Sequence, residues 1–316
     1  MAKHGPLEDR LVVLIGGSGF LGTHVAQALL ERGARLRIAS RNPERAFRLK
    51  TLANLGQIQF VRCNVTNPAS VAAAMQGADA AAYLVGAFKG DLQALQADGA
   101  GLAAKSAADE GAGAFAYVSA TVADTESESA YARTKALGEE AVKAAFPSAT
   151  ILRPSVLFGE RDEFINMFAG LISMMPALPI FGANAKLQPL WVDDAAEAIA
   201  TALAGPAAHG GKTYELAGPE VVTMGELNRR IARAQGRKRA FIEMPDALSA
   251  IFAALPLTPM NSDQWRMLKA GAVASGELPG IGKLGIHPKP LSLFLDRWMV
   301  RFRKHGRFGA EQDAAR

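Results

Sequence analysis

The chain has 316 residues, of which 49% are hydrophobic and 21% charged, so it can bury a large core without disulfide bonds. Its one cysteine, Cys63, cannot form an internal disulfide, and no histidine–cysteine cluster accompanies it, so we expect neither a disulfide scaffold nor a metal site. The net charge of +5 comes without any nucleic-acid recognition motif, so nucleic acid is not an expected partner.

Two segments bear on membrane insertion. The N-terminal sequence MAKHGPLEDR contains no apolar run and predicts no secretory signal. The apolar stretch 167–181 is shorter than the roughly 20 residues of a membrane span and contains Pro176 and Pro179. We expect a cytoplasmic protein, or one bound peripherally to a membrane, and expect 167–181 to form either a core helix or the lining of an apolar pocket.

The first half of the chain alternates apolar strands with helical patterns. The predicted strands are 10–15, 35–40, 58–63, 80–86, 114–120 and 149–154. The predicted helices are 19–32, 43–50, 68–75, 91–110 and 131–146. This alternation predicts an α/β fold with a doubly wound parallel sheet of the Rossmann type, covered by helices on both faces.

The regular alternation ends at Pro154. Within 190–203 we expect the end of a strand and then a helix capped by Asp193 or Asp194, and we expect a helix over 223–236 that begins with a Thr223–Glu226 capping box. Predicted strands at 212–218 and 239–245 and helices at 246–255 and 262–272 complete this half. The expected domains are 8–154 as the nucleotide-binding domain, completed by 189–218; 155–188 and 219–290 as a smaller irregular α/β lobe; and 291–316 as a basic amphipathic tail.

A glycine-rich turn follows the first predicted strand. Gly16, Gly19 and Gly22 have the spacing G-x-x-G-x-x-G at the start of a helix, with Phe20 and Leu21 between the last two glycines. Glycines in this context allow a tight turn, close approach of a pyrophosphate and close helix packing. The free N–H groups of the helix start would then face the phosphates, so these five residues predict a dinucleotide site.

The end of the second predicted strand indicates which dinucleotide is bound. Ser40 and Arg41 occupy the place where an acidic residue would hold a ribose 2′-hydroxyl, and Arg45 follows one helical turn later. A hydroxyl and cations suit a 2′-phosphate, so NADP(H) is favoured, with NAD(H) as the alternative. Further cofactor contacts are predicted near the adenine, the nicotinamide-side ribose and the nicotinamide amide, at Asn64, Val65, Val85, Gly86 and Pro154.

A candidate catalytic pair lies on the helix predicted over 131–146. Tyr131 and Lys135 are one turn apart and face the same side, where a lysine would lower the pKa of the phenol. Such a pair can relay a proton to a carbonyl while hydride moves, and the lysine can also bond the nicotinamide ribose. Either Ser119 or Thr121, at the end of the fifth predicted strand, would supply a third hydroxyl.

Together, these motifs resemble the extended or atypical short-chain dehydrogenases/reductases, which include NAD-dependent epimerases and dehydratases. Within that superfamily, the segments IGGSGFLGTHV, YLVG, YARTKALGEEAV, ILRPSVLFGERDEFINMFA and LQPLWVDDAAEAI resemble the nucleotide-binding alpha subcomplex subunit nine of respiratory complex I. The resemblance implies a tightly held NADPH, a largely structural role, and a place beside the peripheral arm near the membrane. Gln96 replaces the asparagine of the extended pattern, and only about nine residues separate Thr121 from Tyr131, which argues against sugar epimerisation.

The C-terminal segment is basic and amphipathic. Leu291, Phe294 or Leu295, Trp298 and Phe302 recur at helical spacing, with Arg297, Arg301 and Lys304 on another face. Such a helix can bind anionic lipid, dock on an acidic partner, or pack on its own domain.

Two functions follow from the sequence. The first, which the resemblance implies, is a complex I accessory protein at the cytoplasmic face of the inner membrane, or on the matrix side of a mitochondrion. The other is an NADPH-dependent reductase of an apolar carbonyl compound that uses Tyr131 and Lys135.

Overall fold

The computed structural model describes residues 5–255 and 260–304 and divides the chain into two compact units. The described residues of unit 1 fall within Met1–Pro154, Val192–Leu216 and Ala274–His287. Those of unit 2 fall within Ser155–Trp191, Ala217–Val273 and Pro288–Arg316.

Unit 1 is built on a seven-stranded sheet with the strand order β11-β6-β5-β4-β1-β2-β3. Its strands are β1 (Leu11–Ile15), β2 (Arg35–Ser40), β3 (Ile58–Arg62), β4 (Ala80–Tyr83), β5 (Ala114–Val118), β6 (Thr150–Pro154) and β11 (Thr213–Leu216). Every pairing in this sheet is parallel. The strands β4 and β5 are buried throughout, as expected for a sheet covered on both faces. The predicted doubly wound α/β fold is therefore confirmed.

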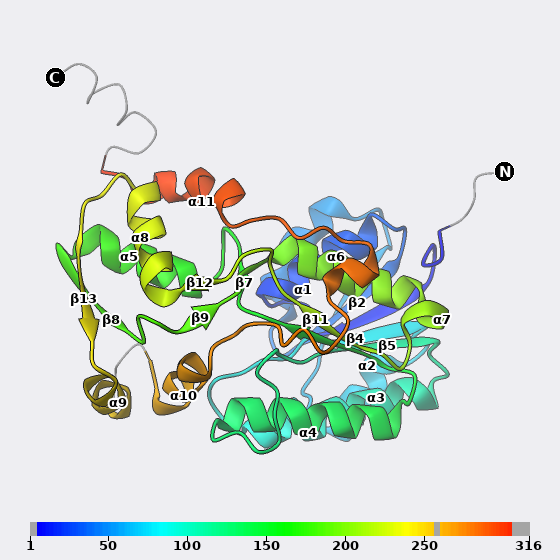
Figure 1. Ribbon diagram of the computed structural model, residues 1–316. Coiled ribbons are helices and arrows are strands. Elements are labelled where there is room, and N and C mark those ends of the chain that lie inside the picture. The colour runs from blue at the N-terminus through cyan, green and yellow to red at the C-terminus, as the bar shows by residue number, and fades with distance from the viewer. Residues whose placement is uncertain (1–4, 256–259, 305–316) are drawn as a thin grey trace. The chain divides into compact units, whose positions relative to one another are not determined.

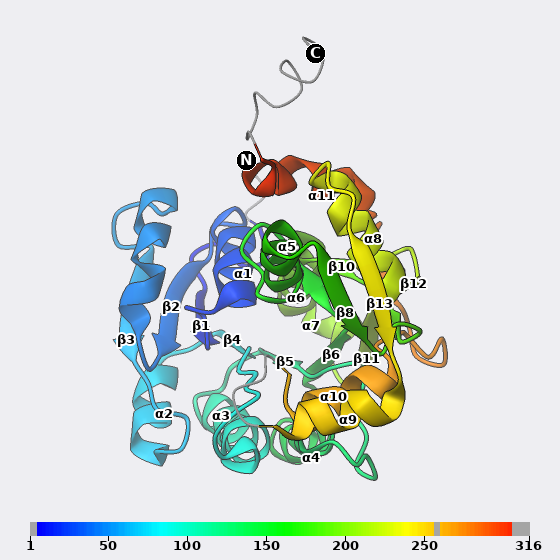
Figure 2. The ribbon, with the colours of Figure 1, turned by 90° about the vertical axis from the view of Figure 1, so that its left-hand side faces the viewer.

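Helices form a layer on each face of the sheet. The helical segments of unit 1 are α1 (Phe20–Leu30), η1 (Pro43–Leu52), α2 (Pro68–Met75), η2 (Gln93–Asp98), α3 (Gly99–Asp109), α4 (Ala130–Ala145), α6 (Val192–Ala204), α7 (Pro206–His209) and η3 (Ile281–Leu284). Figures 1 and 2 show α1 and α6 on one face, with α2, α3 and α4 on the other. A core of valine, alanine and aromatic side chains fills the space between the sheet and the α2–α4 layer.

Three helices of unit 1 differ from the prediction. The segment predicted as a helix over 43–50 is the 3-10 helix η1, and the helix predicted over 91–110 begins with the π-helical turn η2. The helix α6 begins at Val192, so Asp193 and Asp194 lie in its first turn rather than at its cap, and the predicted cap is wrong. The Asp193 carboxylate instead contacts Nδ1 of His24 on α1 at 2.5 Å, and both aspartates complement the positive end of the helix dipole.

Unit 2 has short strands packed with five helices of eight or more residues in its described part. Its elements are β7 (Leu157–Phe158), α5 (Phe164–Met174), β8 (Ala177–Phe181), β9 (Lys186–Leu187), β10 (Leu190–Trp191), β12 (Val222–Thr223), α8 (Met224–Ala234), β13 (Ala240–Met244), α9 (Asp246–Ala254), α10 (Ser262–Ala270), α11 (Ser292–Met299) and η4 (Val300–Phe302). The Thr223 side chain caps α8 by accepting the Glu226 N–H at 3.1 Å, while the Glu226 carboxylate bonds Arg230. The Thr223 cap is thus confirmed, although Glu226 is engaged by Arg230.

The C-terminal helix α11 contributes to the core of unit 2. Leu291, Leu295, Trp298 and Met299 are buried there with side chains of α5 and α8. The apolar face of this segment is therefore used within its own unit, and Arg297, Arg301 and Lys304 remain exposed. The predicted tail residues 305–316 lie outside the described residues.

The segment 274–287 belongs to unit 1, whereas the predicted domain boundaries place it in the smaller lobe. The buried Glu215 of β11 explains this placement, because its carboxylate accepts the backbone N–H groups of Ser275 and Gly276. The Glu215 N–H also donates to the carbonyl of Pro279 at 2.9 Å. Long-range bonds of this kind leave no periodic signal in the sequence.

Candidate functional site

The glycine-rich turn lies at the carboxyl edge of the parallel sheet. The strand order reverses between β1 and β4, and ligands of such sheets bind at this point of reversal. Gly16 has a φ of +83°, and its N–H donates to the Ala39 carbonyl at 2.8 Å. A Cβ at Gly16 would lie 3.2 Å from Leu84 C and Val85 N, so the turn and the end of β4 are in close contact.

Gly22 packs against the same turn. A Cβ at Gly22 would lie 2.6 Å from Gly17 Cα and 2.7 Å from Gly16 O, closer than real Cβ atoms approach. The absence of a side chain here lets α1 start directly behind the turn. Gly19, Phe20 and Leu21 form the beginning of this helix, whose first N–H groups follow the turn.

The end of β2 carries an unpartnered buried hydroxyl. Ser40 Oγ is buried and has no hydrogen-bond partner in the described part of the chain. Arg41 and Arg45 are exposed beside it, with no carboxylate at the strand end. Buried hydroxyls in folded proteins are almost always hydrogen-bonded, so this one suits a ligand that offers a hydrogen-bond acceptor.

Arg48 is a third arginine of this region and was not among the residues predicted from the sequence. Its Nη2 donates to Thr23 Oγ1 on α1 at 2.9 Å. Arg45 and Arg48 are three residues apart in the 3-10 helix η1, where residues i and i+3 lie on the same side, so this spacing could have indicated Arg48.

The other predicted cofactor contacts follow strands of the same sheet. Asn64 is exposed and accepts hydrogen bonds from the N–H and hydroxyl of Thr66, while Val65 is buried. Val85 and Gly86 follow β4, and the Val85 carbonyl accepts a bond from Lys135. Pro154 ends β6 and accepts the Thr121 N–H at 3.0 Å. Because all these strands are parallel, their carboxyl ends lie at the edge that holds the glycine turn.

Lys135 is buried on α4, and two backbone carbonyls hold its ammonium group. Nζ donates to Val85 O at 3.0 Å and to Val118 O at 2.7 Å, and it lies 5.9 Å from the centre of the Tyr131 ring. Burial lowers the pKa of Lys135 to about 7, although the nearby Glu139 carboxylate opposes this shift. These two bonds use two of the three ammonium protons.

Tyr131 has a raised pKa, contrary to the expected lowering by its lysine. Burial raises the pKa of the Tyr131 phenol to about 12. The ring of Phe88, from the loop after β4, stacks on Tyr131 with 4.7 Å between ring centres and 17° between planes. Phe88 was not predicted as a site residue, since nothing in a loop sequence indicates a stacking partner.

Ser119 directly follows β5 and contacts a buried carboxylate. Ser119 is 2% exposed, and its hydroxyl contacts Glu139 Oε1 at 2.5 Å. The same carboxylate accepts two bonds from Arg153, at 2.7 and 2.8 Å. Glu139 was also missed, although its position one turn after Lys135 places it on the same face of α4.

Gln96 lies in the π-helical turn η2 and is completely buried. Its side-chain nitrogen donates to Ala87 O and Thr134 Oγ1, each at 3.3 Å, while Oε1 has no partner among the described residues. Its backbone carbonyl accepts the Tyr117 hydroxyl at 3.0 Å. Gln96 thus links η2 to α4 and β5.

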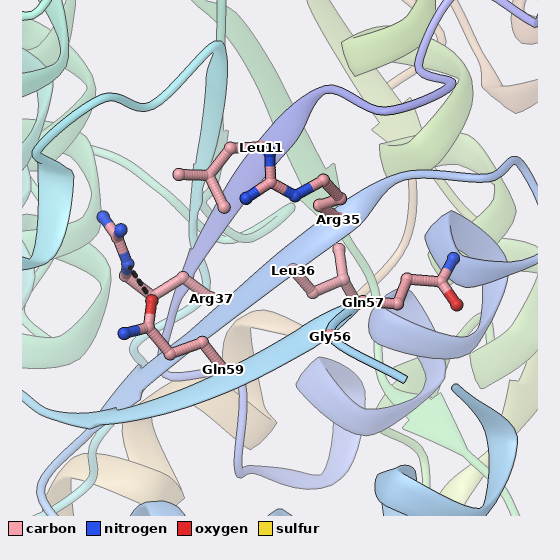
Figure 3. A pocket seen from close by; sticks show the side chains of 7 residues that line it. All are labelled: Leu11, Arg35, Leu36, Arg37, Gly56, Gln57 and Gln59. Carbon is pink, nitrogen blue, oxygen red and sulfur yellow. Dashed lines mark hydrogen bonds between the residues drawn. The ribbon is translucent and has the colours of Figure 1, made fainter. Parts of the chain in front are cut away.

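A pocket of about 360 Å³ lies at the other end of the strands (Figure 3). Its lining residues are Leu11, Arg35, Leu36, Arg37, Gly56, Gln57 and Gln59. Leu11 and Arg35 are the first residues of β1 and β2, so this pocket is at the amino edge of the sheet and separate from the candidate nucleotide site.

Comparison with known proteins identifies the family. Residues 12–217 match the NAD dependent epimerase/dehydratase family, and the chain therefore belongs to it. The family and the fold support binding of a pyridine nucleotide.

Two curated relatives have different names. The chain is 29% identical to the mitochondrial NADH dehydrogenase [ubiquinone] 1 alpha subcomplex subunit 9 of Arabidopsis thaliana, over 94% of this chain and 79% of the relative. It is 31% identical to ceramide reductase of Caulobacter vibrioides, over 75% of this chain and 74% of the relative.

A solved structure shares the fold. The dTDP-glucose 4,6-dehydratase DesIV from Streptomyces venezuelae, solved with NAD and TYD bound, has a TM-score of 0.72 at 19% identity. The match covers 94% of this chain and 98% of DesIV.

Proposed function

We propose that this protein holds NADP(H) as a structural component and is an accessory or assembly protein associated with respiratory complex I. The observation that carries the holding role is the engagement of two of the candidate catalytic groups, Lys135 and Ser119. Lys135 donates to the carbonyls of Val85 and Val118, and the Ser119 hydroxyl is bonded to Glu139. These bonds favour a site that binds the nucleotide over one arranged for proton transfer.

The preference for NADP(H) rests on the end of β2. The buried, unpartnered Ser40 hydroxyl and the exposed Arg41 guanidinium supply a hydrogen bond and a charge for a 2′-phosphate. Arg45 would add a second cation. The remaining contacts would come from the glycine turn, with Asn64 and Val65 near the adenine and Val85, Gly86 and Pro154 near the nicotinamide half.

The association with complex I rests on the named relatives and on the exposed face of α11. The Arabidopsis relative is named as a subunit of NADH dehydrogenase. The apolar side of α11 is buried in unit 2, so the exposed Arg297 of this helix and the exposed Lys304 that follows η4 are available to an acidic partner or anionic lipid. Arg301, in η4, already donates to Glu160 O and Asn166 Oδ1. Among the described residues, no helix is both long and apolar enough to cross a membrane. We infer a peripheral location at the cytoplasmic face of the inner membrane, or at the matrix side of a mitochondrion.

The test is gentle purification from the native membrane fraction, followed by denaturation and identification of any released nucleotide. We expect about one NADPH per chain, in protein that co-purifies with NADH:ubiquinone oxidoreductase, and no oxidation of that NADPH by a panel of carbonyl compounds and quinones. Protein without nucleotide, or without the respiratory complex, would contradict the proposal.

A second candidate, a reductase of an apolar carbonyl compound, is favoured by Tyr131 and Lys135 on one side of α4 and by the ceramide reductase relative. Tyr131 would donate its phenolic proton to the carbonyl oxygen, and bound NADPH would supply a hydride to the carbonyl carbon. Turnover of such a substrate that is lost in Tyr131→Phe, with NADPH affinity unchanged, would support this candidate over the first.

A further inference from the structure

The buried Ser119–Glu139–Arg153 cluster bears on which hydroxyl faces the nucleotide. Ser119 lies between β5 and α4, and its hydroxyl is 2.5 Å from Glu139 Oε1. A serine hydroxyl has one proton to donate, and here a carboxylate accepts it. The hydroxyl therefore cannot also donate to a ligand without leaving Glu139.

That exchange would be unfavourable because Glu139 is buried. Its side chain is only 3% exposed, and its other strong partner is the Arg153 guanidinium. Charge-assisted hydrogen bonds of this kind are shorter and stronger than neutral ones, and a buried carboxylate that loses one is costly. The cluster fixes the Ser119 side chain toward α4.

Thr121 has the opposite environment two residues later. Its backbone N–H donates to Pro154 O at 3.0 Å, which anchors it at the carboxyl edge of the sheet. Its side chain is partly exposed, and its hydroxyl makes no hydrogen bond with the described residues. It is thus the hydroxyl at the end of β5 that remains available to a ligand.

We propose that Glu139 is a positioning residue that withdraws Ser119 from the site and leaves Thr121 as the hydroxyl that faces the bound nucleotide and any carbonyl ligand. This inference rests on the proposed nucleotide site at the same edge of the sheet. Of the two hydroxyls predicted as alternatives, Thr121 rather than Ser119 would then face the ligand.

Thiol labelling tests the proposal without requiring turnover. Ser119→Cys and Thr121→Cys are each made in a Cys63→Ser parent, and alkylation by iodoacetamide is followed with and without NADPH. Reaction at Thr121→Cys should be at least about tenfold faster than at Ser119→Cys, because the latter thiol is buried beside a carboxylate that raises its pKa. NADPH should slow alkylation of Thr121→Cys.

Two further arms make the test specific. Glu139→Gln, added to Ser119→Cys, should speed alkylation at position 119, whereas Glu140→Gln, on the exposed adjacent residue, should leave the rate unchanged. If the Cys63→Ser parent does not fold, the same rates can be read peptide by peptide in chains that keep the buried Cys63.

Equal or faster alkylation at Ser119→Cys, or an unprotected Thr121→Cys in protein with NADPH bound, would overturn the proposal. An unchanged alkylation rate at position 119 in the Glu139→Gln variant would show that Glu139 does not position Ser119. NADPH binding by the parent protein is measured separately. A parent that binds no nucleotide would contradict the proposed function, while the rates without NADPH would still decide between Ser119 and Thr121.

Discussion

At the scale of single residues, the site depends on hydrogen-bond donors whose partners differ from those the sequence suggests. Lys135 points to backbone carbonyls, Ser119 to Glu139, and the buried Ser40 hydroxyl to no described group. Spacing along a helix predicts which side chains share a face, but not which acceptor each side chain bonds.

We expect Arg41→Asp to weaken NADPH binding about 10- to 100-fold, because a charge-assisted bond to the 2′-phosphate contributes about 1.5–3 kcal/mol. NADH, which lacks this phosphate, should lose much less affinity. Titration of both nucleotides by fluorescence measures the difference, with Lys105→Asp on the exposed side of α3 as a control of equal charge change. Equal losses for the two nucleotides would remove the argument for a 2′-phosphate.

Two helical glycines provide a matched pair of alanine substitutions. Gly22→Ala places a Cβ 2.6 Å from Gly17 Cα, and we expect it to destabilise the protein by about 2 kcal/mol and to weaken nucleotide binding. Gly170→Ala in α5 meets nothing within 4 Å and should stabilise by about 0.5–1 kcal/mol. Urea unfolding of both variants checks the contrast; a neutral Gly22→Ala would show that the turn can relax.

At the scale of whole elements, α4 is tied to its neighbours by polar side chains along one face. Tyr131 stacks with Phe88, Lys135 bonds the chain after β4 and β5, and Glu139 bonds Arg153 of β6. The helix is therefore held to three strands or their following loops by groups that are one turn apart.

We expect Glu139→Gln to lower the free energy of unfolding by about 3 kcal/mol, because the partly buried Arg153 loses its carboxylate partner. Glu140→Gln changes the same charge one residue later on the exposed side and should have an effect within about 0.5 kcal/mol. Chemical denaturation compares the two variants. If both behave alike, the cluster around Ser119 contributes no stability of its own.

The sequence predicted the elements of unit 1 well because their strands are buried and their helices amphipathic. It did not predict the π-helical turn around Gln96 or the start of α6 at Val192, since both depend on tertiary packing. For the site, the glycine turn and the Tyr131–Lys135 spacing could be recognised in the sequence. Their roles in binding and catalysis stay predictions. Glu139 and Phe88 could not be assigned, because their partners lie 14 or more residues away in sequence.

At the scale of the whole molecule, one buried cation should shape the dependence of stability on pH. The pKa of Lys135 falls from 10.5 to about 7 on folding, through burial. Between these values the unfolded chain binds a proton that the folded protein does not, so this lysine makes stability rise with pH. Its charged or titratable neighbours are Glu139, Tyr117 and Tyr131, and burial keeps both tyrosines protonated above pH 10.

We therefore expect Lys135→Met to flatten the rise in unfolding free energy between pH 7.5 and 9.5, roughly, by up to about 1.4 kcal/mol per pH unit. Urea unfolding without nucleotide at several pH values measures the slope. Lys105→Met, on an exposed lysine of α3, should keep the slope of the parent protein. A slope that is unchanged in Lys135→Met would mean that this ammonium keeps its ordinary pKa.

The distribution of aromatic residues between the two units has a practical consequence. All three tryptophans, Trp191, Trp265 and Trp298, belong to unit 2, whereas the four tyrosines belong to unit 1. Excitation at the red edge of the protein absorption band would therefore report on unit 2 alone, while the tyrosine component, separated from the overlapping tryptophan bands by second-derivative absorbance, would report on unit 1. The native chain thus carries separate optical probes for its two units, and a cofactor that stabilises one unit before the other would be visible without any label.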